Sequence, residues 1–163
     1  MNTRLSSSVL TLALATLTLA PAYAATQGPI DITAQKLEVN QSSSKAVFSG
    51  NVVVTQQGLT LTAPTVTADY TSKAGNSGIQ TVTASGGVVI TRNGTGGVTE
   101  KATGSTAVYN PDAGNLTLTG AVTLVRGPSE LSGDKLVYNL TTGNAVVTNS
   151  AGPVKARFVP GGK

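Results

Sequence analysis

The fold is decided by a stretch of eight residues, Phe48-Ser49-Gly50-Asn51-Val52-Val53-Val54-Thr55. In an extended chain its even-numbered residues share one face and its odd-numbered residues share the other. The even face is apolar around its glycine, whereas the odd face carries mostly polar side chains. Residues 116–124 (LTLTGAVTL) repeat this arrangement, and helical periodicity is missing after residue 24. A period of two predicts strands that bury one face.

This pattern is part of an internal repeat. Each unit begins with a small residue and two mostly polar residues, followed by an apolar alternation. The four units begin near residues 34, 63, 104 and 133, so that the outer intervals are 29 residues and the middle one is 41. Extra residues around Ser72–Gly78 and Asn93–Gly97 explain the longer interval, and their Gly, Ser and Asn content predicts surface turns. A period near 30 residues predicts stacked units that share one core.

At the start of each unit the alternation slips by one residue. In the first unit, Ile32 and Ala34 are followed on the same face by Leu37 and Val39. Because the slip recurs in all four units, we predict a bulge or corner that keeps one face inward as the chain turns. The predicted bends lie near Gln35, Pro64, Ser105 and Asp134. We therefore expect an all-β fold, a curved roll of roughly 12 to 16 short antiparallel strands.

The first 24 residues have the pattern of a secretory signal peptide. Arg4 is followed by an apolar run from Val9 to Ala20, and Ala22-Tyr23-Ala24 supplies the small residues of a cleavage site. The run is shorter than the roughly 20 residues that span a bilayer, which disfavours a retained anchor. We predict cleavage after Ala24 and a single exported domain over residues 25–163.

The composition excludes most catalytic and metal chemistry. The chain has no His and no Cys, which removes thiol nucleophiles, disulfides, histidine acid–base catalysis and nearly every zinc, copper or haem site. Its net charge of +4 is spread along the chain, without the clustered Lys and Arg or interleaved aromatics of a nucleic-acid binder. We expect a protein that is not an enzyme and that has no cofactor, metal or nucleic-acid partner.

Four fragments, taken in order, carry a family resemblance. They are Gly50-Asn51-Val52-Val53-Val54-Thr55-Gln56, Leu59-Thr60-Leu61-Thr62-Ala63, Leu118-Thr119-Gly120-Ala121 and Gly133-Asp134-Lys135-Leu136-Val137-Tyr138. Their order and spacing resemble LptA, the periplasmic lipopolysaccharide-transport bridge family with the OstA-type repeat, over residues 30–159. The resemblance implies a twisted β-jelly-roll, open along one side, whose apolar interior holds the acyl chains of lipopolysaccharide or a related glycolipid.

The same resemblance implies a location and partners. Members of the family stack end to end in the periplasm, between the inner-membrane complex and the outer-membrane translocon. The implied partners are LptC-like and LptD-like OstA domains and further copies of the chain, joined head to tail. A non-enzymatic structural or surface β-repeat that self-assembles without lipid is the alternative.

The inward positions of the better-patterned units form the predicted lipid site. Large side chains are scarce, so a roll lined by Val, Leu, Ala and Gly is expected to leave space for acyl chains. The predicted lipid-binding residues are Ile32, Leu37, Phe48, Val52, Val54, Leu59, Leu61, Leu118, Val122, Leu124, Leu136 and Tyr138. The hydrophobic effect would contribute about 0.8 kcal/mol for each buried methylene.

Charged side chains are expected to lie outside that interior. The seven carboxylates, none of which forms a catalytic pattern, are Asp31, Glu38, Asp69, Glu100, Asp112, Glu130 and Asp134. We expect them to be exposed, and we expect Asp134 to accept hydrogen bonds from backbone amides at its corner. The cations that could meet lipid phosphates, or else line a solvated edge, are Lys36, Lys45, Lys135, Arg126 and Arg157.

An unclosed roll has two edge strands. We place the first within Ile30–Ala34 and the last within Val154–Val159. Each edge would expose unpaired backbone N–H and C=O groups, which form a template for another chain. Pairing of the last edge with the first is heterologous and predicts a filament.

Overall fold

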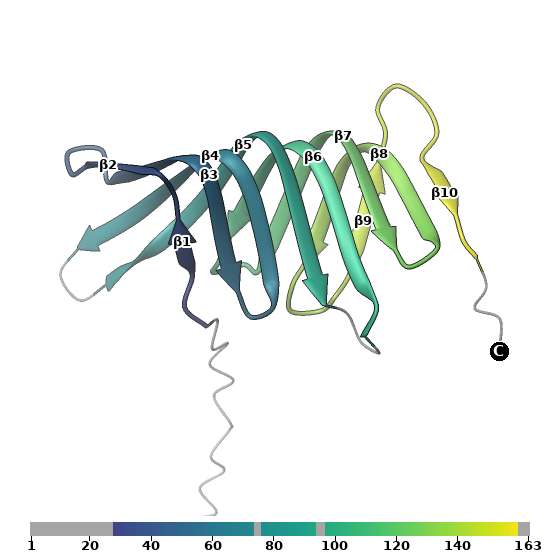
Figure 1. Ribbon diagram of the computed structural model, residues 1–163, viewed down its shortest axis with the longest axis horizontal. Helices are drawn as coiled ribbons and strands as arrows, with labels where there is room; N and C mark the ends of the chain where they lie inside the picture. The colour runs from purple at the N-terminus through teal and green to yellow at the C-terminus, as the bar shows by residue number, and fades with distance from the viewer. Residues whose placement is uncertain (1–27, 74–75, 94–96, 160–163) are drawn as a thin grey trace, which may run out of the picture.

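The computed structural model describes residues 28–73, 76–93 and 97–159, and these are built almost wholly from antiparallel strands (Figure 1). They contain ten strands in one sheet and no α-helix, which confirms the all-β prediction. The strands are β1 (Asp31–Thr33), β2 (Lys36–Asn40), β3 (Lys45–Gln56), β4 (Leu59–Lys73), β5 (Asn76–Asn93), β6 (Thr99–Asn110), β7 (Asn115–Arg126), β8 (Ser129–Asn139), β9 (Ala145–Thr148) and β10 (Lys155–Arg157).

The sheet follows the order β1-β3-β4-β5-β6-β7-β8-β10, with β2 also paired to β3 and β9 also paired to β8. Strands β3 to β8 are long, and each bends once, so that the sheet folds over itself into a roll (Figure 1). The expectation of 12 to 16 short strands is wrong. Backbone pairing resumes within two or three residues of each bend, so a bend folds a strand without ending it.

The bends lie where the sequence placed them. At each one, two residues of one strand oppose a single residue of its neighbour, as in a β-bulge. The two-to-one pairs are Gly50-Asn51 opposite Pro64, Gly86-Gly87 opposite Ser105, and Gly120-Ala121 opposite Asp134. All six bulge residues have a positive φ, between 47° and 100°. Near Gln35, the remaining predicted bend, the Gln35 N–H donates to the Gly50 carbonyl at 3.0 Å. We call this line of bulges the corner.

The corner divides the roll into two facing layers. Layer A contains β1, β10 and residues 52–63, 88–93, 99–103 and 122–133, whereas layer B contains β2, β9 and residues 45–49, 65–73, 76–85, 106–119 and 135–139. A continuous apolar core fills the space between them, with Val52, Val66 and Leu118 fully enclosed. Opposite the corner, the open side of the roll is lined by the described hairpin turns of both layers, at residues 57–58, 111–114, 127–128 and 140–144 (Figure 1).

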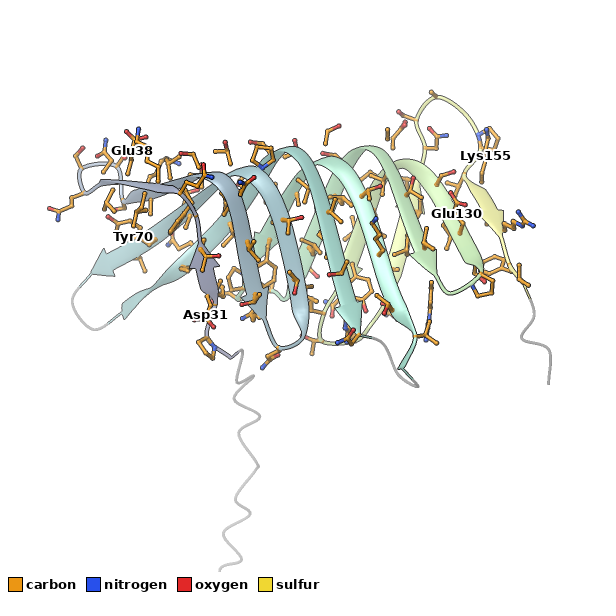
Figure 2. All side chains as sticks on the ribbon, viewed as in Figure 1. Asp31, Glu38, Tyr70, Glu130 and Lys155 are labelled. Carbon is orange, nitrogen blue, oxygen red and sulfur yellow. The ribbon has the colours of Figure 1, made fainter. Side chains whose placement is uncertain are left out.

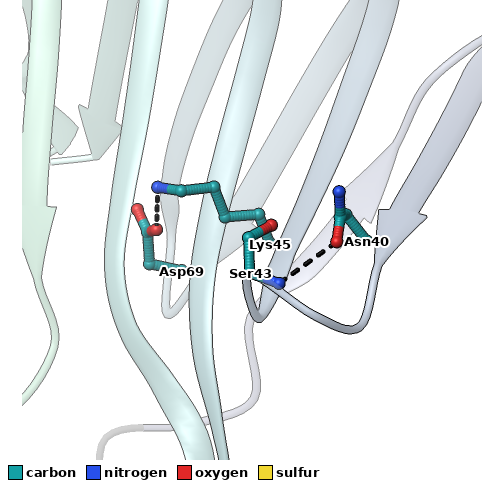
Figure 3. A network of polar contacts seen from close by, with 4 residues as sticks. All are labelled: Asn40, Ser43, Lys45 and Asp69. Atoms are coloured by element: carbon teal, nitrogen blue, oxygen red, sulfur yellow. Dashed lines mark hydrogen bonds and ion pairs between the residues drawn. The ribbon is translucent and has the colours of Figure 1, made fainter.

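Three turns of layer B share the same kind of hydrogen bond, from a backbone N–H to an Asn side-chain oxygen. The Asn40 side-chain oxygen accepts from the Ser43 N–H at 3.1 Å, beside the Lys45–Asp69 ion pair (Figure 3). Asn110 and Asn139 accept in the same way, from the amides of Ala113 at 3.0 Å and Thr142 at 2.8 Å. Asn and Asp side chains favour turns because they bond to backbone a few residues ahead.

The extra residues of the second unit do not all form a turn. Thr71, Ser72 and Lys73 pair with Gly78, Ser77 and Asn76, so these residues extend the β4–β5 hairpin. The second predicted insertion lies largely outside the described residues, although Asn93 pairs with Thr99. The insertion near Ser72–Gly78 therefore lengthens two strands, because backbone pairing continues through polar residues.

Asp134 has the structural role expected of it at the last bend. Its Oδ2 accepts from the Ser150 N–H at 2.8 Å and from the Ser150 hydroxyl at 2.6 Å. These bonds hold the pKa of the Asp134 carboxyl below its ordinary value, since they favour the charged form. They also fix the loop between β9 and β10 against the corner.

Candidate functional site

The candidate site is the apolar interior between the layers. Among the predicted residues, six are buried in the core cluster and five more pack against it. The buried six are Val52, Val54, Leu61, Leu118, Val122 and Leu136, and the five packed against them are Ile32, Phe48, Leu59, Leu124 and Tyr138. The alternation therefore identified inward positions correctly, and lipid binding by these residues stays a prediction.

Leu37 is the exception. Its side chain is 53% exposed, on β2, where all five residues are exposed. Strand β2 pairs with β3 alone, at one end of the roll. The sequence pattern gave the correct face of the sheet, but it carries no information about where the sheet ends.

Some interior residues were missed. They are chiefly residues of the second unit and its neighbours: Ala63, Val66, Ala68, Val82, Ala84, Val88, Ile90, Ala102, Ala107, Tyr109 and Leu116. The extra residues of that unit obscured the repeat spacing on which the choice of positions rested. The period of two within β5 and β6 was the signal that would have found them.

The interior is filled by the protein's own side chains. One cavity of about 20 Å³ lies among residues that include Val54, Leu61, Tyr109 and Leu116, and another of about 30 Å³ is lined in part by Leu116 and Leu124. A single water needs about 10–15 Å³ of such volume, so neither cavity accommodates an acyl chain. The expectation of open space is wrong for this conformation, because small side chains let the layers approach until they interdigitate.

The open side is bridged by side chains. A hydrogen bond joins Gln56 of layer A to Tyr109 of layer B, and Arg92 of layer A donates to the Tyr138 hydroxyl of layer B. The Arg92 guanidinium also lies 5.5 Å from the centre of the Tyr138 ring, within cation–π range. We call Gln56, Arg92, Tyr109, Tyr138 and the neighbouring Leu140 the mouth.

Burial and a hydrogen bond shift the pKa of Tyr109, at the mouth, in opposite directions. Burial raises the pKa of its phenol, because the charged form is poorly solvated, and the hydrogen bond from Gln56 lowers it by a smaller amount. The net shift is upward, so Tyr109 is neutral at physiological pH. A cavity of about 60 Å³ at the mouth is lined by residues that include Gln56, Leu59, Arg92 and Leu140.

A row of charged side chains lies at the inner rim of layer A. Arg92, Glu100 and Arg126 are direct cross-strand partners on β5, β6 and β7. Each is two residues from an interior side chain, namely Ile90, Ala102 and Leu124, so the row faces inward. Glu100 lines the 30 Å³ cavity, and its side chain is 19% exposed. The prediction that Glu100 is exposed is wrong, since its side chain continues the inward alternation of β6.

Within the described residues, each end of the roll is formed by strands that have a paired neighbour on one side only. Strand β1 lies within the predicted first edge and β10 within the predicted last edge, and β2 and β9 extend these edges along layer B. Figure 2 shows Glu38 and Lys155 at opposite ends of the molecule. Apolar side chains at these ends are exposed, including Val39 at 57%, Val146 at 58% and Phe158 at 71%.

Within the described residues, no three acidic side chains converge on a possible metal site. No helix in this part of the chain is long and apolar enough to cross a membrane.

Known proteins resemble the chain in sequence and in fold. Residues 31–144 match the family described as LptA/(LptD N-terminal domain) LPS transport protein. An uncharacterized protein of Rhizobium meliloti (strain 1021) is 30% identical over 138 residues, covering 81% of this chain and 72% of the relative. The crystal structure of LptH of Pseudomonas aeruginosa, the LptA homologous periplasmic component of the lipopolysaccharide transport device, matches with a TM-score of 0.70 at 22% identity, covering 81% of this chain and 96% of LptH. This likeness confirms the predicted jelly-roll fold.

Proposed function

Because the chain belongs to the family of LptA and LptD N-terminal lipopolysaccharide-transport proteins, we propose that it carries lipopolysaccharide or a related glycolipid across the periplasm. In this proposal it is a bridge component between the inner and outer membranes. It binds lipid and catalyses no reaction. The acyl chains occupy the interior and the polar headgroup stays at the mouth.

One observation carries the proposal: the apolar interior is closed on one long side by backbone and on the other by side chains. Entry of an acyl chain would separate the layers at the mouth and leave the corner intact. The lost contacts between Leu59, Leu116 and their neighbours would be replaced by contacts with lipid methylenes. Each buried methylene contributes about 0.8 kcal/mol, which offsets the loss of protein packing and of freedom on binding.

Site-directed photocrosslinking tests the interior site. Leu59 borders both interior cavities and the mouth, so a photoreactive phenylalanine analogue there should crosslink to lipopolysaccharide. Thr62 is exposed on the same strand and serves as the control position. Crosslinking at residue 59 and not at 62 supports the proposal. Equal crosslinking at both positions, or none, contradicts it.

The filled core favours a second candidate function. A roll with cavities of about 20 and 30 Å³ has a complete core without ligand. A structural β-repeat that assembles without lipid would need only such a complete core. Mass spectrometry of a solvent extract of the purified protein discriminates between the two, since a lipid carrier retains lipid in amounts comparable to protein and a structural repeat does not.

We further propose that the two ends of the roll join it to its partners. Each end combines a free strand edge with exposed apolar side chains, which suits pairing with another OstA-type domain. The partners would be LptC-like and LptD-like domains and further copies of the chain, head to tail. Val146→Lys should reduce self-association measured by light scattering, whereas Val108→Lys, away from both ends, should not. A wild-type chain that stays monomeric at high concentration contradicts the self-association.

The proposed function requires that the protein be exported to the periplasm. Residues 1–24, which lie outside the described residues, would be removed as a signal peptide, leaving Ala25 as the first residue of the periplasmic protein. The intact mass of the exported protein measures this directly. A mass that still includes residues 1–24 contradicts it.

A further inference from the structure

We propose that the row Arg92, Glu100 and Arg126 is a subsite for the anionic headgroup of an amphiphile whose acyl chain lies in the interior. This inference rests on the proposed lipid function and adds the headgroup chemistry and the residues that recognise it. The ligand group would be a phosphate monoester or a similar compact anion. The experiment below separates a lipid headgroup from a free anion.

The position of the row suits the headgroup of a lipid. The three side chains are cross-strand neighbours on the inner face of layer A, at the ends of β5, β6 and β7 next to the open side. Immediately deeper on the same face are Ile90, Ala102 and Leu124 of the apolar core. The row thus lies at the boundary between the apolar interior and solvent. An amphiphile with its chain in the interior would present its headgroup at this boundary.

The row contains two guanidinium groups and one carboxylate, which leaves an excess of one positive charge. Glu100 is paired with Arg126, with Arg126 Nε 3.3 Å from Glu100 Oε1. Within the part of the chain that the structure describes, no carboxylate is recorded at ion-pair distance from Arg92. The excess charge therefore belongs to Arg92, the partly buried member at the mouth.

Arg92 has a neutral hydrogen-bond partner that a phosphate can replace. Its recorded contacts are the Tyr138 hydroxyl and the face of the Tyr138 ring, both from the opposite layer. A guanidinium has five N–H donors in a planar fork, so one phenol leaves most of them available. Separation of the layers by an entering chain would break the Tyr138 contact. A phosphate can then take its place with two parallel hydrogen bonds, which is the geometry that Arg favours.

Two amphiphiles with the same chain test the subsite. Dodecyl phosphate and dodecyl maltoside differ in headgroup charge, and each is titrated below its critical micelle concentration by calorimetry. The wild-type protein should bind the phosphate about tenfold more tightly, as expected from one charge-assisted hydrogen-bonded pair. Arg92→Gln should remove that tenfold preference and leave the affinity for the maltoside unchanged.

Lys101→Gln is the matched control. Lys101 is next to Glu100 on β6 and is exposed on the outer face, opposite Thr91 of β5. Its removal changes the net charge by the same amount and should leave both affinities unchanged. Arg126→Gln, at a side chain that is 57% exposed, provides a second variant that should fold, with an expected loss of about threefold for the phosphate alone.

The outcomes separate this inference from the proposed function. If wild type binds neither amphiphile, the lipid function and the subsite both fail. If it binds both equally, or if Arg92→Gln and Lys101→Gln have the same effect, the interior site stands and the subsite is wrong. Inorganic phosphate is titrated alone as a third ligand. Binding of inorganic phosphate as tight as that of dodecyl phosphate, and lost in Arg92→Gln, would identify a free-anion site and overturn the headgroup assignment.

Discussion

The two long sides of the roll are closed by different means. At the corner, β3, β5 and β7 each contribute two positive-φ residues opposite one residue of the neighbouring strand, and the ladder resumes on both sides. At the mouth, no strand of layer A pairs with a strand of layer B in the described residues, and side chains alone cross the gap. One side is closed by continuous backbone and the other by Gln56–Tyr109 and Arg92–Tyr138.

For the proposed function, this difference makes the mouth the side that we expect to open. Opening the corner would break backbone pairing in six consecutive strands. Opening the mouth breaks the two side-chain bridges, each worth about 0.5–3 kcal/mol, and exposes apolar surface that an acyl chain can cover. The proposed route of lipid entry and the charged row then lie on the same side of the molecule.

The largest effect is expected from Gly120→Ala at the corner. Gly120 has a φ of +82°, and an added Cβ would lie 2.7 Å from the Ser105 Cβ, too close for either to remain in place. The strain of placing alanine in a left-handed backbone conformation and the clash with Ser105 together should lower the free energy of unfolding by about 3 kcal/mol or more. Urea denaturation monitored by circular dichroism measures the change.

Gly58→Ala is the control for Gly120→Ala. Gly58 has nearly the same φ, +80°, but nothing lies within 4 Å of the added Cβ. The loss there should be about 1 kcal/mol, from backbone strain alone. Equal losses in the free energy of unfolding at the two positions would mean that close packing around Gly120 does not stabilise the corner.

The corner was predictable from sequence, and the mouth was not. Each bend appears as a one-residue slip near Gln35, Pro64, Ser105 or Asp134, because a bulge changes the alternation within a few residues. Arg92 and Tyr138 are separated by 45 intervening residues, and their meeting depends on how far the sheet curls. The inward position of Glu100 followed the alternation, yet the ordinary preference of carboxylates for solvent led to the opposite expectation. The filled interior likewise depends on the spacing of the layers, which no local pattern encodes.

Leu116→Ala tests whether the interior is limited by its own packing. Leu116 borders both interior cavities and is 5% exposed, so its truncation should join them into a larger space. The expected loss of stability is about 2–3 kcal/mol, as for large-to-small changes in a core. Affinity for dodecyl maltoside should rise, because the chain then enters with less separation of the layers. If affinity falls together with stability, the interior does not receive the chain.

Tyr138→Phe removes a bridge from the mouth and keeps the ring. The loss of the Arg92–Tyr138 hydrogen bond should lower the free energy of unfolding by about 1–2 kcal/mol. Hydrogen exchange should become faster in β8 near the mouth while the corner amides keep their protection. Tyr70→Phe, at a residue of β4 in layer B, is the control and should leave exchange at the mouth unchanged. Faster exchange at the corner in Tyr138→Phe would contradict the division between the two sides.

The smallest effect is expected at the bend near Asp134, where a carboxylate accepts hydrogen bonds. Asp134 accepts two hydrogen bonds from Ser150, which lower the pKa of its carboxyl. A group with a lowered folded pKa contributes stability above its unfolded pKa, about 3.9, and loses that contribution as the pH falls through the folded value. Asp134→Asn should therefore lower the unfolding midpoint slightly at pH 7, and the difference from wild type should vanish in acid. Asp112→Asn, in an exposed turn, should match wild type at both pH values. A difference that is the same at neutral and acid pH would show that the Asp134 charge does not stabilise this bend.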